Sequence, residues 1–152
     1  MPSATEIRLE RNPEFWRDLL EQPDVRAAMR GLDSSIGVDA VIGNQSVLPF
    51  ASENGGYIFV RMDPFGTIYD LHALYSTEGR GREAHGALKA ALDRVNADLI
   101  VAFETDDTHS RPPLSFGFKA AGECRHTSLG PVRTWILTRE AWEASKARAR
   151  LN

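Results

Sequence analysis

The sequence has little of what several classes of protein require. It contains one cysteine, Cys124, which excludes an intramolecular disulfide and a cysteine-based metal cluster and favours a reducing compartment. No segment approaches the roughly 18 consecutive apolar residues of a membrane-spanning helix, and the charged N-terminal segment is unlike a signal peptide. We therefore expect a cytoplasmic protein with no membrane partner.

The sequence also lacks an excess of positive charge and several common catalytic motifs. The net charge of -3, from 18 Lys and Arg against 21 Asp and Glu, argues against a nucleic-acid partner. The patterns G-x-S-x-G, G-x-x-x-x-G-K-[ST] and G-x-G-x-x-G are missing, which disfavours serine hydrolases, P-loop enzymes and Rossmann proteins. The acidic run ETDD at 104–107, followed by His109, lacks a fixed ligand spacing, so we predict no metal site.

The chain alternates between candidate strands and helices without a linker or repeat, which indicates a single domain over residues 1–152. Two helical segments are predicted after Asn12, with Pro13 at the first helical position, a break near Gln22-Pro23 and a stop at Gly31. Further helices are predicted at 83–95, 114–118 and the C-terminus. Strands are predicted at 38–42, 46–51, 57–62, 67–75 and 98–104, with a hairpin around 129–131 and turns at 43–44 and 53–56. This order predicts an α/β fold (mixed α+β) whose central, mostly antiparallel sheet of about five to seven strands is flanked by helices.

A turn rich in glycine and arginine precedes the helix in the stretch YSTEGRGREAHGALKAAL, residues 75–92. The first N–H groups of a helix lack partners within it and carry partial positive charge, so they favour an anion, best a phosphate. Gly79 and Gly81 permit a tight turn and close approach, and Arg80 and Arg82 can donate charge-assisted hydrogen bonds. The alternative is a solvated charged turn that caps the helix through Ser76, Thr77 or Glu78.

This strand, turn, helix and strand resemble the coenzyme-binding core of the GNAT superfamily of acyl-CoA N-acyltransferases, whose turn has the pattern Q/R-x-x-G-x-G/A. The segment GTIYDLHALYSTEGRG resembles the family's fourth strand and loop, and GFKAAGECRHTSLGPVRTWILTREAW its closing strands, so the likeness covers about residues 50 to 142. If the motif is aligned to start at Glu78, Gly81 matches its fourth position, but Glu83 stands at the sixth position, where the family has Gly or Ala. If it is aligned to start at Gly79, Ala84 matches the sixth position, but Arg82 stands at the fourth position, where the family has Gly. This form is most similar to divergent sequences of tailed phages and prophages.

The resemblance implies that acetyl-CoA is the co-substrate and that the acyl group passes directly to an amine acceptor. Pantetheine would lie along the backbone of Leu71 to Tyr75, with a gap in the sheet after Ala73, and a homodimer is compatible with the family. The residues implied in coenzyme binding are Ala73, Leu74, Gly79, Arg80, Gly81, Arg82 and Ala84.

The catalytic side chains common in the family are missing from this sequence. Thr67 or Tyr69 stands where many family members have a catalytic Glu, and the position of the family's catalytic Tyr falls near Pro113. Local substitutes are His72 as general base, next to Asp70 on one strand face, Tyr75 as an acid near the sulfur, and Glu104 where the amine would arrive. The commoner role for a histidine in this position is that of a hydrogen-bonded residue of the sheet.

The acidic run at 104–107 can equally be a solvated loop, or it can favour a cationic acceptor. We therefore carry two hypotheses from the sequence. The first is an acetyl-CoA-dependent N-acetyltransferase. The second is a GNAT-fold binding or assembly protein without catalysis, in a phage or prophage setting.

Overall fold

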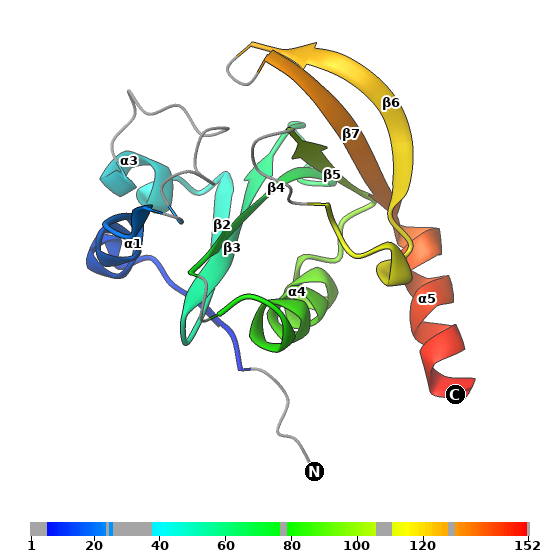
Figure 1. The fold of residues 1–152 in the computed structure, drawn as a ribbon, viewed down its shortest axis with the longest axis horizontal. Coiled ribbons are helices and arrows are strands. Elements are labelled where there is room, and N and C mark those ends of the chain that lie inside the picture. Colours follow the sequence, from blue (N-terminus) through cyan, green and yellow to red (C-terminus); the bar gives the residue numbers. More distant parts are fainter. Residues whose placement is uncertain are drawn as a thin grey trace. The chain divides into compact units, whose positions relative to one another are not determined.

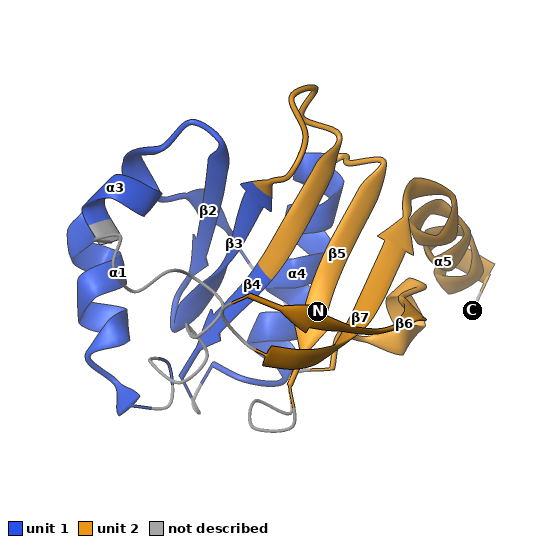
Figure 2. Ribbon diagram, turned by 90° about the horizontal axis from the view of Figure 1, so that it is seen from above, with its two compact units in different colours: residues 1–60, 72–95 blue, residues 61–71, 96–152 orange. Residues whose placement is uncertain are grey.

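The computed structural model describes residues 6–23, 25, 38–76, 79–105, 111–127 and 130–151. The chain divides into two compact units, residues 1–60 with 72–95 and residues 61–71 with 96–152 (Figure 2). Strands within the described ranges follow the hydrogen-bonded order β1-β2-β3-β4-β5-β7-β6, and β4 contributes residues to both units. The predicted mixed α/β fold with a mostly antiparallel sheet is confirmed, while the single domain stays a prediction.

The first unit contains the N-terminal strands and helices, and Figure 1 labels all of them except β1. They are β1 (Arg8–Leu9), α1 (Pro13–Leu20), α3 (Val38–Gly43), β2 (Val47–Ser52), β3 (Gly55–Arg61), the end of β4 (Ile68–Tyr75) and α4 (Arg82–Val95). Strands β2 and β3 pair antiparallel with Ser52 opposite Gly55, so two residues make the turn. Gly55 and Gly56, which we predicted to be part of a turn, instead begin β3.

Side chains of this unit separate onto two faces of its strands, as the alternation of a strand requires. One face packs against α1 and α3 in a core of Trp16, Leu19, Val25, Ile42, Val47, Ala51, Ile58 and Leu74. On the other face, the Tyr57 hydroxyl donates to the Ala84 carbonyl in α4 at 3.0 Å, and the Arg94 guanidinium of that helix lies 5.0 Å from the Phe50 ring centre. Helix α4 buries Ala87, Leu88, Ala91 and Leu92, which recur at the three-four spacing of one helix face.

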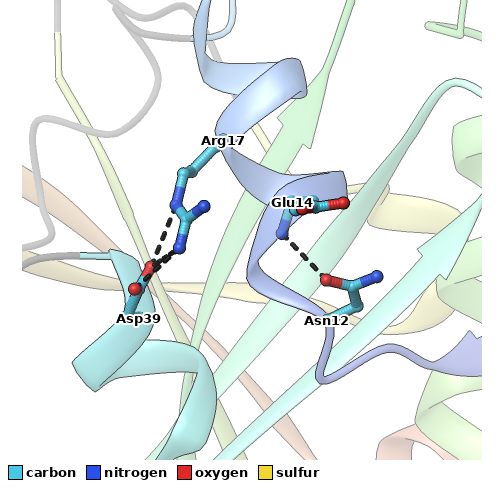
Figure 3. Close-up of polar contacts among 4 residues, drawn as sticks. All are labelled: Asn12, Glu14, Arg17 and Asp39. Carbon is cyan, nitrogen blue, oxygen red and sulfur yellow. Dashed lines mark hydrogen bonds and ion pairs between the residues drawn. The ribbon is translucent and has the colours of Figure 1, made fainter.

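Helix α1 begins as the sequence predicts. The Asn12 side chain accepts a hydrogen bond from the Glu14 N–H at 3.0 Å (Figure 3). Pro13 occupies the first helical position. Arg17 in α1 donates to both carboxylate oxygens of Asp39 in α3, at 2.6 and 2.7 Å (Figure 3). This bidentate pair joins the two helices on the surface.

The strand predicted at 38–42 is wrong, because this segment forms the helix α3. A short apolar run fits either a buried strand or one side of a helix, and tertiary packing decides between them. Here Ile42 enters the core with Trp16, while the Arg11 guanidinium donates to the Ile42 and Val47 carbonyls at 2.9 and 3.0 Å. The stop predicted at Gly31 lies outside the described residues.

The second unit contains the start of β4, β5 (Leu99–Glu104), η2 (Leu114–Phe116), β6 (Lys119–His126), β7 (Gly130–Thr138) and α5 (Arg139–Leu151). The predicted strand, short helix and terminal helix are confirmed, and β6 and β7 pair antiparallel as the predicted hairpin. Helix α5 packs on η2, with the Trp142 and Phe116 rings 5.3 Å apart and the Ser145 hydroxyl donating to the Ser115 carbonyl. Within the described ranges, helices are too short or too polar to cross a membrane.

Candidate functional site

The turn before α4 is built by short backbone hydrogen bonds at the end of β4. The Gly79 N–H donates to the Ser76 carbonyl at 3.0 Å, and the Ala84 and His85 N–H groups reach back to Gly79 and Gly81 at 3.1 and 2.9 Å. Gly81 has a φ of 90°, a left-handed conformation that other residues adopt only with strain. Thr77 and Glu78, two of the predicted alternative caps, lie outside the described residues.

The two glycines of the turn serve different purposes. A Cβ atom added to Gly79 would lie 2.8 Å from Tyr75 Cδ1 and 2.9 Å from Asn54 Cβ, so this glycine lets the turn pack against the β2–β3 hairpin. A Cβ added to Gly81 would have nothing within 4 Å. Gly81 therefore sets the backbone conformation and leaves open space beside the turn.

Both predicted arginines lie at the surface of this turn. Arg80 and Arg82 are exposed, and neither guanidinium forms a hydrogen bond or ion pair with the described part of the chain. A guanidinium presents several N–H donors in a planar fork suited to phosphate oxygens. The turn thus combines a helix N-terminus, a left-handed glycine and two exposed cations, which together are suited to an anion.

Glu83, the residue that departs from the family pattern, is turned toward the β2–β3 hairpin. Its Oε2 accepts hydrogen bonds from the Ser52 hydroxyl at 2.7 Å and the Asn54 N–H at 2.8 Å, and its Oε1 accepts from Asn54 Nδ2 at 2.9 Å. Burial acts to raise the pKa of Glu83, but the hydrogen bonds from Ser52 and Asn54 together outweigh it and keep the pKa below the usual value. The carboxylate is therefore charged at neutral pH.

Tyr75 completes a hydrogen-bonded group that we call the Glu83 cluster: Ser52, Asn54, Tyr75 and Glu83. The Tyr75 hydroxyl lies 2.7 Å from Ser52 Oγ, and its ring is 5.2 Å from that of Tyr57. Burial raises the pKa of Tyr75 to about 12, in spite of the Ser52 hydrogen bond and with help from the Glu83 charge. Burial also raises the pKa of Tyr57. The hydroxyl that we predicted near a sulfur is thus placed among these side chains, and its catalytic role stays a prediction.

The remaining predicted residues of β4 differ in their exposure. Ala73 is the one exposed residue of the strand, Leu74 is buried in the core, and His72 is partly buried. The parallel pairing of β4 with β5 covers Ile68 to Asp70 opposite Leu99 to Val101. This ladder ends at Asp70, earlier than the gap predicted after Ala73.

Glu104 lies in the second unit, at the end of β5, directly opposite Arg133 in β7. Its Oε1 accepts from Arg133 Nε at 2.9 Å and from Trp135 Nε1 at 3.3 Å, and Oε2 lies 4.0 Å from Arg111 Nε. The carboxylate is thus an ion-paired, buried group. Asp106, Asp107 and His109 lie outside the described residues, and the remainder contains no group of His, Cys, Asp and Glu side chains arranged to hold a metal ion.

Sequence reasoning missed the roles of Ser52 and Asn54. In the sequence these residues are part of a polar Ser-Glu-Asn segment between two apolar strands, a pattern typical of an ordinary hairpin turn. Ser52 is only 1% exposed, and a buried hydroxyl requires a partner, which Glu83 and Tyr75 supply. That partner is distant in sequence and could not be inferred from local spacing.

Comparison with protein-family models and with curated proteins finds no match. Solved structures do match. The spermidine N-acetyltransferase SpeG of Vibrio cholerae, in complex with CoA and spermine, aligns with a TM-score of 0.66 at 15% identity, over 93% of this chain and 99% of that one. A protein of T. thermophilus described as an acetyltransferase aligns with a TM-score of 0.62 at 14% identity, over 100% and 96% of the two chains. Another protein described as an acetyltransferase reaches 0.70 at 15% identity.

These alignments span nearly whole chains on both sides, so the match is to a complete fold and not to a shared strand–helix unit. The chain has the GNAT fold of acyl-CoA N-acyltransferases, as the resemblance over residues 50 to 142 predicted. The structures to which it is similar include the SpeG enzyme.

Proposed function

We propose that the protein is an acetyl-CoA-dependent N-acetyltransferase. The observation that carries this proposal is the turn at 79–82, where Gly81 and the exposed Arg80 and Arg82 stand at the start of α4 in a chain with the GNAT fold. The SpeG structure, which holds CoA and spermine, supports a coenzyme and an amine as ligands of this fold. The coenzyme pyrophosphate would bind at the turn, with pantetheine along the exposed Ala73 side of β4.

The reaction requires an amine nitrogen to attack the thioester carbonyl. A C–N bond forms, the C–S bond breaks, the amine loses one proton and the departing thiolate gains one. We propose His72 as the group that accepts the amine proton, since it is partly buried and lies one residue from Ala73 on β4. A cytoplasmic location, a homodimer and a cationic acceptor stay predictions.

A binding or assembly role without catalysis is the second candidate. It is favoured by the hydrogen bonds of two predicted catalytic groups, since Tyr75 pairs with Ser52 and Glu104 pairs with Arg133. Only the acetyltransferase requires coenzyme binding, whereas a binding or assembly protein can either retain or lack it. The two candidates differ in whether acetyl-CoA is converted to CoA thiol when amines such as spermine and spermidine are added.

Calorimetric titration with CoA tests the coenzyme site that the acetyltransferase requires. Replacing Arg80→Ala together with Arg82→Ala should weaken CoA binding by about 2 to 4 kcal/mol, because two charge-assisted donors are lost. The matched control is Arg148→Ala with Arg150→Ala, which removes two exposed arginines of the same spacing from α5 and should leave the affinity unchanged.

Equal affinity of the wild type and the Arg80/Arg82 variant would remove the turn as the anion site. Absence of CoA binding by the wild type would reject the acetyltransferase and favour the binding or assembly role, with protein partners in place of the coenzyme.

A further inference from the structure

The Glu83 cluster connects three separate segments of the first unit. Ser52 and Asn54 come from the β2–β3 hairpin, Tyr75 ends β4, and Glu83 lies in the first turn of α4. The turn at 79–82 lies in the chain between the last two of these positions. Any movement of the start of α4 away from the hairpin would therefore break the hydrogen bonds to Glu83.

Water cannot easily replace the Glu83 carboxylate as the acceptor of this cluster, because the hydroxyl groups around it are buried. Ser52 is 1% exposed and Tyr75 is 4% exposed, and their hydroxyls lie 2.7 Å apart, so loss of the carboxylate would leave one hydroxyl of this buried pair without an acceptor. Gly79 adds a second constraint, because its close contact with Asn54 and Tyr75 leaves no room for a side chain. Hydrogen bonds and packing thus fix the turn to the hairpin from both of its ends.

The orientation of the carboxylate decides how its charge acts. A negative charge in the first turn of a helix would repel a bound anion if it pointed at the ligand. Here both oxygens point to the hairpin, where they accept three hydrogen bonds of 2.7 to 2.9 Å from neutral donors. The three donors thus hold the carboxylate against the hairpin.

We propose that Glu83 is a positioning residue for coenzyme binding: it ties the start of α4 to Ser52 and Asn54 and so holds the Gly81 backbone and Arg82 in place for the pyrophosphate. This inference rests on the proposed function. It also turns the apparent mismatch in the family pattern into a functional feature, because a carboxylate at this position does what a small residue cannot.

The sequence offers a matched control for the experiment. The tripeptide Arg-Glu-Ala begins α4 as residues 82–84 and α5 as residues 139–141. Glu140 is exposed, so Glu83→Ala and Glu140→Ala remove the same side chain from the same local sequence. Only the first removes the acceptor of the cluster.

The test combines two measurements on the full-length protein. In CoA titration, Glu83→Ala should weaken binding about tenfold, Glu83→Gln by less, and Glu140→Ala should have no effect. In hydrogen–deuterium exchange without ligand, Glu83→Ala should speed exchange of the amides at 79–88 relative to those of α5. Ser52→Ala should act in the same direction, and its effect on CoA affinity should be smaller when combined with Glu83→Ala.

The two measurements separate the possible failures. If the wild type binds CoA and Glu83→Ala binds equally or more tightly, the inference is overturned, because repulsion or no effect would then prevail. If the wild type does not bind CoA, the proposed function fails and the role of Glu83 in coenzyme binding fails with it, while faster exchange at 79–88 in Glu83→Ala would show only that Glu83 holds the start of α4. Unchanged exchange at 79–88 in Glu83→Ala contradicts the inference in either case.

Discussion

Helices α4 and α5 begin with the same three residues but use them in opposite ways. In α4, Glu83 accepts hydrogen bonds from the hairpin while Arg82 is exposed. In α5, Arg139 donates to the Asn96 carbonyl at 2.7 Å and pairs with Asp98 at 2.9 Å, while Glu140 is exposed. The neighbours, and not the tripeptide, decide which charge is structural and which remains available to a ligand.

A glycine lies close to the start of each helix, and replacing it should give the largest effect. Gly117, with a φ of 105°, would place a Cβ 2.9 Å from the Ala141 carbonyl oxygen, so Gly117→Ala should destabilise the fold by about 3 kcal/mol. Gly79→Ala should cost about 2 kcal/mol, since its nearest neighbours include side-chain atoms that can shift. Denaturant unfolding checks both values. Gly43→Ala, with nothing within 4 Å, is the control, and a loss there as large as at Gly79 would contradict the packing argument.

The Glu83 cluster at the start of α4 contains a buried tyrosine, Tyr75, so the free energy of unfolding should depend on alkaline pH through this side chain. Its pKa is raised to about 12 in the fold, against about 10 for an unfolded tyrosine, so unfolding favours ionisation. The stability that Tyr75 contributes is present below about pH 10 and is lost as the pH rises toward 12. Tyr75→Phe should cost about 1 kcal/mol at neutral pH, because a hydrogen bond to Ser52 is removed.

The alkaline part of that prediction is measured by chemical unfolding at several pH values. Between pH 10 and 12 the wild type should lose more stability than Tyr75→Phe, so the difference between them should shrink. Parallel loss in the two proteins would show that ionisation of Tyr75 is not coupled to unfolding.

The smallest effect is expected from the arginines of the two helix starts. Arg139→Ala should lower the free energy of unfolding by at most about 1 kcal/mol, because its ion pair with Asp98 is half exposed. Arg82→Ala should leave the stability unchanged within error and weaken CoA binding instead. A reversed result, with Arg82 stabilising the fold and Arg139 affecting CoA, would break the comparison.

Periodic and strongly patterned elements were predictable from the sequence. The alanine-rich stripe of α4, the apolar run of β5 and the cap at Asn12 each follow from local spacing or side-chain chemistry. Helix α3 was not predictable, because six residues are too few to separate a helical from a strand pattern. The turn at 79–82 was identified from its residues, but the bonds of Glu83, Tyr75 and Glu104 depend on partners distant in the chain.

The pairing of Ser52 with Glu83, 31 positions apart, has a consequence for how such sequences diverge. A change of Glu83 alone removes an acceptor from the buried Ser52 and the partly buried Asn54. A change of Ser52 alone removes one of the hydrogen bonds that hold Glu83. The substitutions are therefore epistatic, and these positions should be exchanged together during evolution. A sequence motif that requires Gly or Ala at position 83 would miss related proteins that have Glu at this position. A motif that includes both the hairpin positions 52 and 54 and the loop would find them.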